Sequence, residues 1–172
     1  SKRRGLETVL KSIPKLIKTI SNFKLVIVGT SSYDNELVKI ADNLNINKYV
    51  DFEGWKNEKL FPSYIKAAQL GVSPLHSNIH HDTTYANKIF QYISLGCPVV
   101  CSDVMAQKAL LDRYDIGLVF EAENTTDLIK KLFKLYLNED LMMKLSENCI
   151  HAIENHLNND IISKELITHY EK

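Results

Sequence analysis

The chain of 172 residues has the length of one ordinary domain, and its 45% of hydrophobic residues is sufficient for a buried core. Lysine plus arginine and aspartate plus glutamate each number 21, so the chain lacks the basic excess of nucleic-acid-binding proteins. No apolar run approaches the ~20 residues that a membrane-spanning helix needs.

Helical and strand patterns alternate in the first part of the chain. Apolar residues recur at helical spacing over residues 6–20, where Pro14 predicts a kink or a break because proline lacks a backbone donor. The apolar run 24–30 is typical of a strand buried on both faces. A helical stripe follows at 35–44, and a short strand with alternating apolar residues at 48–54.

The same alternation continues around one polar loop. Residues 59–69 predict a helix, residues 70–75 a short apolar strand, and the polar residues 76–83 a loop. A helix is expected over residues 84–95. The remaining patterns predict strands at 98–102 and 117–121 and helices at 105–113, 125–137, 139–157 and 159–170.

Strands that alternate with helices of about ten residues imply parallel pairing through right-handed crossovers. We therefore predict an α/β fold with a doubly wound, Rossmann-like parallel sheet in a single domain. Such sheets bind ligands beyond the carboxyl ends of their strands. The relevant loops here follow Gly29, Gly54, Leu75 and Ser102.

The three cysteines, Cys97, Cys101 and Cys149, are odd in number, and their spacing matches no zinc site. Cys97 and Cys101 flank an apolar strand, where a free thiol behaves as a small hydrophobic group. We therefore expect a reduced, cytoplasmic protein.

The predicted helix 84–95 offers a candidate anion site. The free N–H groups of its first turn point toward the polar loop, and the helix dipole favours negative charge there. Thr84, Lys88 and Gln91 share one face by their spacing, and Lys88 adds a positive charge. The opposite stripe, which should pack inward, consists of Tyr85, Ile89 and Ile93. The alternative is that Lys88 and Gln91 form only a solvated helix face.

Six segments, taken in order, resemble the motifs of one enzyme family. They are KRRGLETVL, LVIVGT, VDFEGW, AAQLGVSPLHS, NKIFQYISLGCPVVCSD and IGLVFEAENTTDLIKKL, which begin at residues 2, 25, 50, 67, 87 and 116. Together they resemble the C-terminal, donor-binding domain of GT-B-fold glycosyltransferases of the group 1, or family 4, type. The resemblance implies transfer of a sugar from a nucleoside diphosphate sugar to an acceptor, with retention of configuration, without a metal ion or other cofactor.

The sequence departs from the family pattern in two places. The family usually carries a pair of glutamates eight residues apart, and these positions are Thr83 and Gln91 here. The family domain also begins with a strand ahead of the KRRGLE segment. We therefore expect residues 1–172 to be the nucleotide-sugar-binding domain of a two-domain protein, inactive without its N-terminal acceptor domain. Without the missing strand, the strands at 24–28 and 70–74 are left without a shared partner.

The resemblance also assigns roles to individual residues. Those expected to bind the donor diphosphate are Arg4, Thr84, Asn87 and Lys88. Those expected to contact ribose or sugar hydroxyls are Gln91, Thr83 and His76. Gly54 and Trp55 are expected to bind the base, the glycine through close backbone approach and the tryptophan by stacking. A solvated terminus stays open as an alternative for Arg4, and a cap over the core for Trp55. Catalytic residues are not assigned in this chain.

The loop before this helix also suggests a metal site, through His76, His80, His81 and Asp82. His80 and His81 are adjacent and would face different ways, and the loop has no recognised ligand spacing, so we expect no metal. Asp82 fits a helix N-cap equally well.

Three functions remain open at this point. The first is a glycosyltransferase of polysaccharide or glycoconjugate biosynthesis, whose glycan or lipid-linked acceptor binds through the missing domain. The second is a nucleotide-sugar epimerase of the same architecture. The third, suggested by Gln91, is a noncatalytic domain that binds a nucleotide sugar or a partner. No nucleic-acid partner is expected, and peripheral association with the inner face of the membrane stays open.

Overall fold

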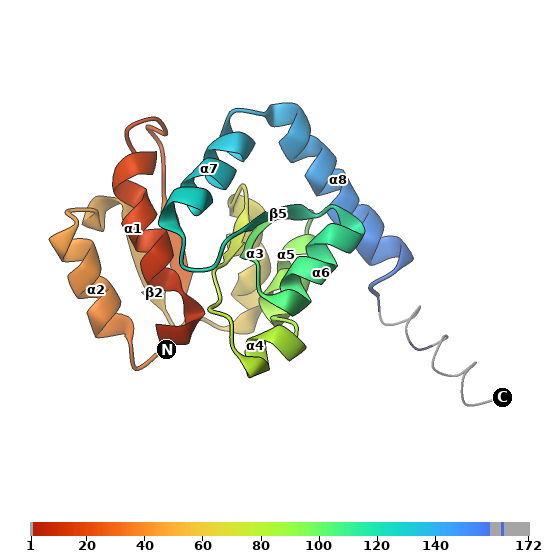
Figure 1. Ribbon diagram of the computed structural model, residues 1–172, viewed down its shortest axis with the longest axis horizontal. Coiled ribbons are helices and arrows are strands. Elements are labelled where there is room, and N and C mark those ends of the chain that lie inside the picture. The colour runs from red at the N-terminus through yellow and green to blue at the C-terminus, as the bar shows by residue number, and fades with distance from the viewer. Residues whose placement is uncertain (1, 159–162, 164–172) are drawn as a thin grey trace.

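The computed structural model describes residues 2–158 and residue 163 (Figure 1). The strands are β1 (Leu25–Val28), β2 (Val50–Gly54), β3 (Gly71–Ser73), β4 (Val99–Ser102) and β5 (Gly117–Phe120). The α-helices are α1 (Leu6–Leu16), α2 (Asp34–Asn43), α3 (Phe61–Ala67), α4 (Ile79–Thr83), α5 (Asn87–Ile93), α6 (Met105–Tyr114), α7 (Thr125–Tyr136) and α8 (Glu139–Asn155). Single 3-10 turns are η1 (Lys2–Arg4), η2 (Asn47–Tyr49) and η3 (Glu58–Leu60). The predicted order of strands and helices is confirmed with two exceptions: α4 lies where a loop was predicted, and the helix predicted at 159–170 lies outside the described residues apart from residue 163.

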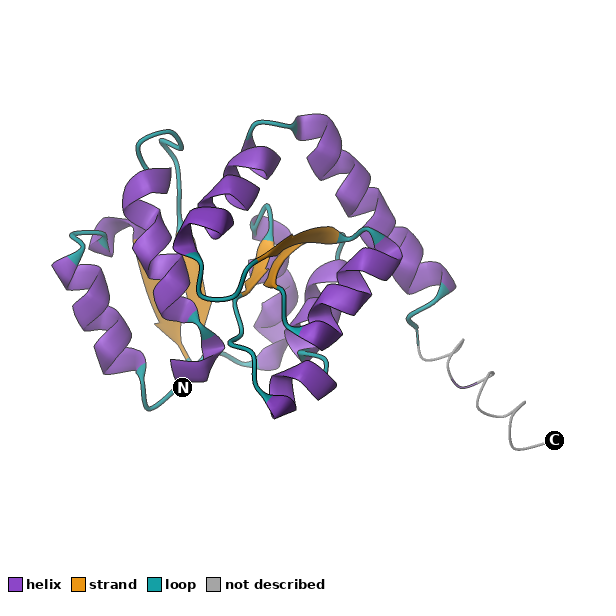
Figure 2. Cartoon of the chain, viewed as in Figure 1, coloured by secondary structure: helices purple, strands orange, loops and turns teal. Residues whose placement is uncertain are grey.

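All strand pairings among the described residues are parallel, as predicted, but they form two separate sheets (Figure 2). One sheet contains β1 and β2, and the other contains β3, β4 and β5 in that order. Within the described part of the chain, β1 and β3 therefore share no partner strand. The expected separation of these two strands is confirmed, whereas the strand that would join them stays a prediction.

Helix α1 connects the two sheets through its packing. Its Leu10 and Ile13 are fully buried in one cluster with Leu37 of α2 and Val50 of β2. Two other α1 side chains, Val9 and Leu16, belong to a second cluster formed with β4, β5 and α7. Accordingly, α1 lies between α2 and α7 in Figure 1. The apolar stripe of one helix thus faces both sheets.

Strand β4 is the centre of the larger sheet, and all four of its residues are buried. Because side chains alternate along a strand, Val99 and Cys101 face a cluster formed with α5, α6 and α8, whereas Val100 faces α1 and α7. A strand covered on both faces reads as a continuous apolar run, which is why the sequence marks it clearly.

Two details of the predicted elements are wrong. Helix α1 does not break at Pro14 but includes it and ends at Leu16. Residues 76–95 contain two short helices instead of one loop and one long helix.

The three cysteines are free and buried, as expected for small hydrophobic side chains. Burial raises the pKa of the Cys97 thiol to about 11 and those of Cys101 and Cys149 to about 12. These thiols are therefore protonated and unreactive at neutral pH. Among the described residues, none of the helices has both the length and the apolar content to cross a membrane.

Candidate functional site

The N-terminal segment is fixed against the loop that follows β3. Gly5 has a φ of +69°, and a Cβ atom there would lie 1.6 Å from the carbonyl oxygen of Pro74 and 3.1 Å from Cδ2 of His76. Only glycine permits both this backbone conformation and this approach. Arg4, which directly precedes Gly5, is thereby held beside the carboxyl end of β3.

Arg4 and Lys88 are two cations whose charges repel each other. Burial lowers the pKa of the Lys88 ammonium to about 8, and repulsion from Arg4 is the second cause of this shift. Arg4 is exposed, whereas Lys88 is half-buried in the first turn of α5. In the described part of the chain, neither side chain forms an ion pair. An anion between the two would relieve their repulsion, so this pair is a chemically suitable phosphate site.

The expected arrangement of Thr84, Lys88 and Gln91 on one helix is wrong. Thr84 lies in extended backbone between α4 and α5, and α5 begins only at Asn87. The physical cause is local hydrogen bonding, because the hydroxyls of Thr83 and Thr84 donate to the carbonyl oxygens of Ile79 and His80 and end α4. Lys88 and Gln91 still lie three residues apart on α5, and Asn87 and Gln91 are exposed.

The inward stripe of this helix is only partly as expected. Ile89 and Ile93 are fully buried, but Tyr85 is 52% exposed, so the prediction that Tyr85 packs inward is wrong. Tyr85 precedes the helix and packs edge-to-face on the ring of Phe90 instead, with ring centroids 5.7 Å apart.

The histidines of the loop after β3 form polar contacts within the loop and with Glu123. His81 Nδ1 lies 2.8 Å from the carbonyl oxygen of His76. The same nitrogen lies 2.8 Å from the side-chain nitrogen of Asn78, so the tautomer of His81 determines which of the two contacts is a hydrogen bond. His76 Nδ1 in turn lies 3.9 Å from Oε1 of Glu123. No group of three or more potential metal ligands is arranged for an ion within residues 2–158 or at 163.

Asp82 lies inside α4 and is therefore not an N-cap, although its side chain contacts the start of α6. Its Oδ1 accepts from the backbone N–H of Met105, the first residue of α6, at 3.3 Å, and its Oδ2 accepts from Ser77 at 2.9 Å. Asn78 is the N-cap of α4, where its side chain accepts from the N–H of His81. Asp82 thus ties the loop to the neighbouring helix α6.

Gly54 ends β2 and Trp55 directly follows it, so both lie at the carboxyl end of a strand of the two-stranded sheet. Gly54 has a φ of +65°, and Trp55 is 73% exposed. The alternative that Trp55 caps the core is therefore wrong. An exposed indole at the carboxyl end of a strand is available for stacking, so its role in base binding stays a prediction.

A buried polar network supports the same edge and was missed by the sequence analysis. The Gln107 side-chain NH₂ donates to the carbonyl oxygens of Ser73 and Ser102, both at 3.1 Å, and its oxygen accepts from the Ser73 hydroxyl at 2.8 Å. The Ser102 hydroxyl donates to the carbonyl oxygen of Leu75 at 2.6 Å. The sequence feature that could have revealed this network is Gln107 itself, a polar residue on the apolar face of α6, three residues before the buried Leu110. The network holds the ends of β3 and β4 together.

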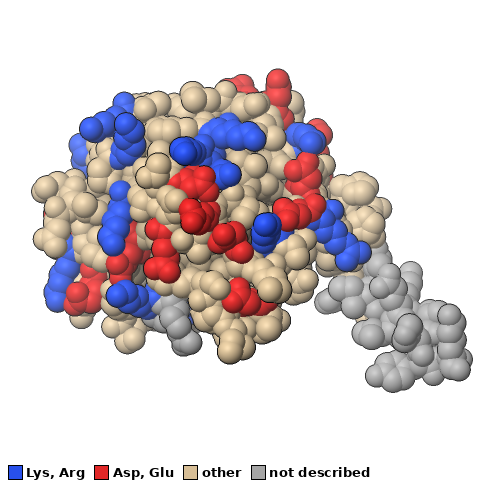
Figure 3. Space-filling view, viewed as in Figure 1, with Lys and Arg blue, Asp and Glu red and all other residues tan. Residues whose placement is uncertain are grey.

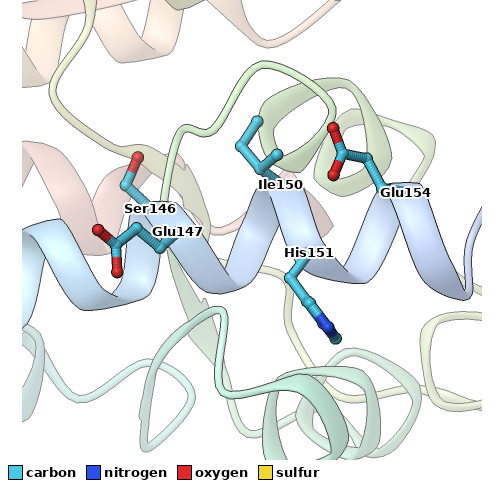
Figure 4. Close-up of a pocket in the computed structure, with 5 residues that line it drawn as sticks. All are labelled: Ser146, Glu147, Ile150, His151 and Glu154. Atoms are coloured by element: carbon cyan, nitrogen blue, oxygen red, sulfur yellow. The ribbon is translucent and has the colours of Figure 1, made fainter.

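Other surface features of the described residues give no alternative candidate site. A hollow of about 350 Å³ lies along α8 and is lined by Ser146, Glu147, Ile150, His151 and Glu154 (Figure 4). It contains none of the predicted site residues. Lysine, arginine and acidic side chains are interspersed over the face seen in Figure 3, without a field of one sign.

Comparison with known protein families identifies one family for this chain. A family model described as "Glycosyl transferases group 1" matches residues 1–152. No curated protein matches the chain.

Solved structures share the fold. A sucrose-phosphate synthase from Thermosynechococcus elongatus matches with a TM-score of 0.85 at 17% identity, over 99% of this chain and 42% of the synthase. The HepE protein of Anabaena in complex with UDP matches with a TM-score of 0.85 at 13% identity, over 99% of this chain and 46% of that protein. The C-terminal domain of LpcC, a group 1 glycosyl transferase of Francisella tularensis, matches with a TM-score of 0.76 at 15% identity, over 92% of this chain and 82% of that domain. The chain thus spans less than half the length of the first two proteins.

Proposed function

Since the chain belongs to the group 1 glycosyl transferases, we propose that it binds the nucleoside diphosphate sugar from which a glycosyltransferase transfers the sugar. The observation that carries the proposal is the pair of cations, Arg4 and Lys88, without carboxylate partners in the described part of the chain, at the carboxyl end of a parallel sheet. Ligands of doubly wound sheets bind at this edge. The Anabaena neighbours were solved with UDP and with UDP and glucose, which supports a nucleotide sugar as the donor.

The two cations have a defined role in this reaction. When the bond between the anomeric carbon and the diphosphate oxygen breaks, negative charge develops on the departing diphosphate. Positive groups already positioned there stabilise that charge more than they stabilise the intact donor. Arg4 and Lys88 supply two such groups from distant parts of the sequence, so we propose a reaction that needs no metal ion or other cofactor.

The remaining expectations from the sequence belong to this proposal. Gln91, Thr83 and His76 are proposed to contact ribose or sugar hydroxyls, and Gly54 and Trp55 the base. Groups that bind the acceptor and complete a retaining mechanism are proposed to lie in a second domain outside residues 1–172. A peripheral membrane location at the cytoplasmic face would suit a lipid-linked acceptor.

One experiment separates the three candidate functions. The full-length protein is incubated with UDP-glucose, GDP-mannose and ADP-glucose, each carrying a labelled sugar, in the presence of a cell extract as the source of acceptor. Transfer of label to an acceptor supports the transferase. An altered sugar in the recovered donor indicates the epimerase, and retention of an unchanged donor on the protein indicates a noncatalytic binding domain. If none of the three donors binds, the proposed donor site is wrong.

A further inference from the structure

Two loops meet across the end of β4, one after β3 and the other after β5. His76 follows β3 by three residues, and Glu123 follows β5 by three residues. Both strands pair with β4, so their carboxyl ends lie on the same edge of the sheet. The Glu123 carboxylate lies 3.9 Å from the His76 ring at this edge. None of the roles discussed above accounts for Glu123.

The loop that carries Glu123 is fixed on both sides. The N–H of Ala122 donates to Oδ1 of Asp103 at 2.9 Å. Asn124 donates from its side chain to Glu121 at 2.6 Å and caps α7 by accepting from the N–H of Asp127 at 2.9 Å. Between these anchors, Glu123 has a φ of +64°, a left-handed conformation that residues with a Cβ atom rarely adopt.

A local turn accounts for the backbone conformation of Glu123. The N–H of Asn124 donates to the carbonyl oxygen of Glu121 at 3.0 Å, and Glu123 is the third residue of this turn, a position at which some turn types require a positive φ. The Glu123 side chain is 66% exposed and that of His76 is 21% exposed, and an exposed ion pair at such a distance contributes little to stability. The carboxylate is therefore available to a ligand at this edge.

The neighbourhood of His76 indicates what that contact is. A Cβ atom at Gly5 would lie 3.1 Å from Cδ2 of His76, so His76 packs against the segment that carries Arg4. A carboxylate repels phosphate but accepts strong hydrogen bonds from hydroxyl groups. Arg4 and Lys88 thus suit a diphosphate, whereas Glu123 with His76 suits an uncharged group that carries hydroxyls.

We propose that Glu123 is a specificity-determining residue that accepts hydrogen bonds from hydroxyls of the donor's sugar, with His76 beside it. This inference rests on the proposed donor site. The fixed carboxylate orients the donor, because its diphosphate is attracted to Arg4 and Lys88 while its sugar is the part that Glu123 binds. A sugar without the matching hydroxyl leaves a carboxylate unpaired and is rejected.

The test compares affinities for UDP, GDP and ADP with those for UDP-glucose, GDP-mannose and ADP-glucose, measured calorimetrically in the full-length protein. For the pair that binds best, the sugar raises the affinity of the wild-type protein. Glu123→Gln lowers the affinity for the sugar-bearing ligand about three- to tenfold, the range expected for a weakened hydrogen bond to a charged group. The same variant binds the bare diphosphate equally well or better, because a nearby negative charge is removed.

Two further variants make the result specific. Glu123→Gly removes the carboxylate and relieves the left-handed strain, so it keeps the fold and shows the same selective loss. Glu139→Gln removes one negative charge from the first turn of α8, at the opposite end of the molecule from α4 (Figure 1), and changes neither affinity. Equal effects of Glu123→Gln on both ligands, or a wild-type protein that gains nothing from the sugar, overturn the role of Glu123 alone. Failure of all three diphosphates to bind overturns the proposed donor site and the role of Glu123 with it.

Discussion

Arg4 and Lys88 are 84 positions apart in the sequence, yet the charge of Arg4 helps to lower the pKa of the Lys88 ammonium to about 8. Burial of Lys88 is the larger cause. Neither cation has a carboxylate partner in the described part of the chain, so a bound anion would offset the repulsion between them.

Replacement of Lys88 by alanine is therefore expected to weaken diphosphate binding selectively. Lys88→Ala should lower the affinity for UDP about tenfold or more, the effect of losing one charge-assisted contact, and leave the affinity for uridine unchanged. Lys130→Ala, at an exposed position on α7, is the matched control and should change neither. Calorimetric titration measures both ligands. Equal losses for UDP and uridine would show that Lys88 does not contact phosphate.

The lowered pKa of Lys88 also predicts a pH dependence of binding. In the free protein the ammonium loses its proton as the pH rises through about 8. Bound diphosphate favours the charged form, so affinity should fall between pH 7 and pH 9, by about tenfold for a group that titrates at 8. The Lys88→Ala variant should show no such fall. A wild-type affinity that is constant over this range contradicts the assignment.

The contact of Gly5 with Pro74 predicts a large effect of a single methyl group. Gly5→Ala places Cβ within 1.6 Å of a backbone oxygen and forces a left-handed conformation, so it should destabilise the protein by about 2–4 kcal/mol. Gly54→Ala is the matched control, because Gly54 has a similar φ of +65° but open space around its Cβ position. It should cost only about 1 kcal/mol. Urea unfolding midpoints measure both, and equal costs would mean that the close approach to Pro74 is unimportant.

Gln91 occupies a position where the family normally has glutamate, and this predicts a gain from one substitution. Gln91→Glu should preserve or improve the affinity for UDP, because a carboxylate accepts ribose hydroxyls more strongly than an amide does. Affinity for inorganic pyrophosphate, which has no ribose, should not improve. Gln91→Ala should lower the affinity for UDP. A clear loss with glutamate would mean that the site is adapted to an amide or does not bind ribose.

The two separate sheets predict that β1 and β3 accept a strand between them. Within residues 2–158, β1 pairs only with β2 and β3 pairs only with β4, and backbone groups at an open strand edge are costly when they lack partners. A form of the protein extended at its N-terminus by about ten to fifteen residues, the length of one strand and its turn, should therefore have a higher urea midpoint than residues 1–172. Amides of β1 and β3 should gain protection from hydrogen exchange in the extended form. If neither stability nor protection increases, the alignment of KRRGLE with the opening of the family domain is wrong, and the role of Arg4 is lost with it.

The alternation of strands and helices could be predicted from the sequence because its cause is local. Side chains repeat every two residues along a strand and every 3.6 along a helix, so Val99, Val100 and Cys101 mark a strand that is covered on both faces. The six segments that resemble the family motifs could likewise be recognised in order along the sequence, and they indicated the family. The failure at residues 76–95 came from side-chain hydrogen bonds, since Thr83 and Thr84 compete with the helix by bonding to carbonyl oxygens one turn back.

The sequence by itself determined the order of the strands and of most helices, and that Lys88 lies near the start of a helix. Only the tertiary structure decided that Gly5 packs on Pro74, that the charge of Arg4 acts on Lys88, and that Glu123 faces His76. These contacts join segments that are far apart in the chain and depend on the parallel sheet, which brings the carboxyl ends of β3, β4 and β5 to one edge. No periodic pattern records such proximity, because it follows from how the strands pair and not from the local preference of any segment.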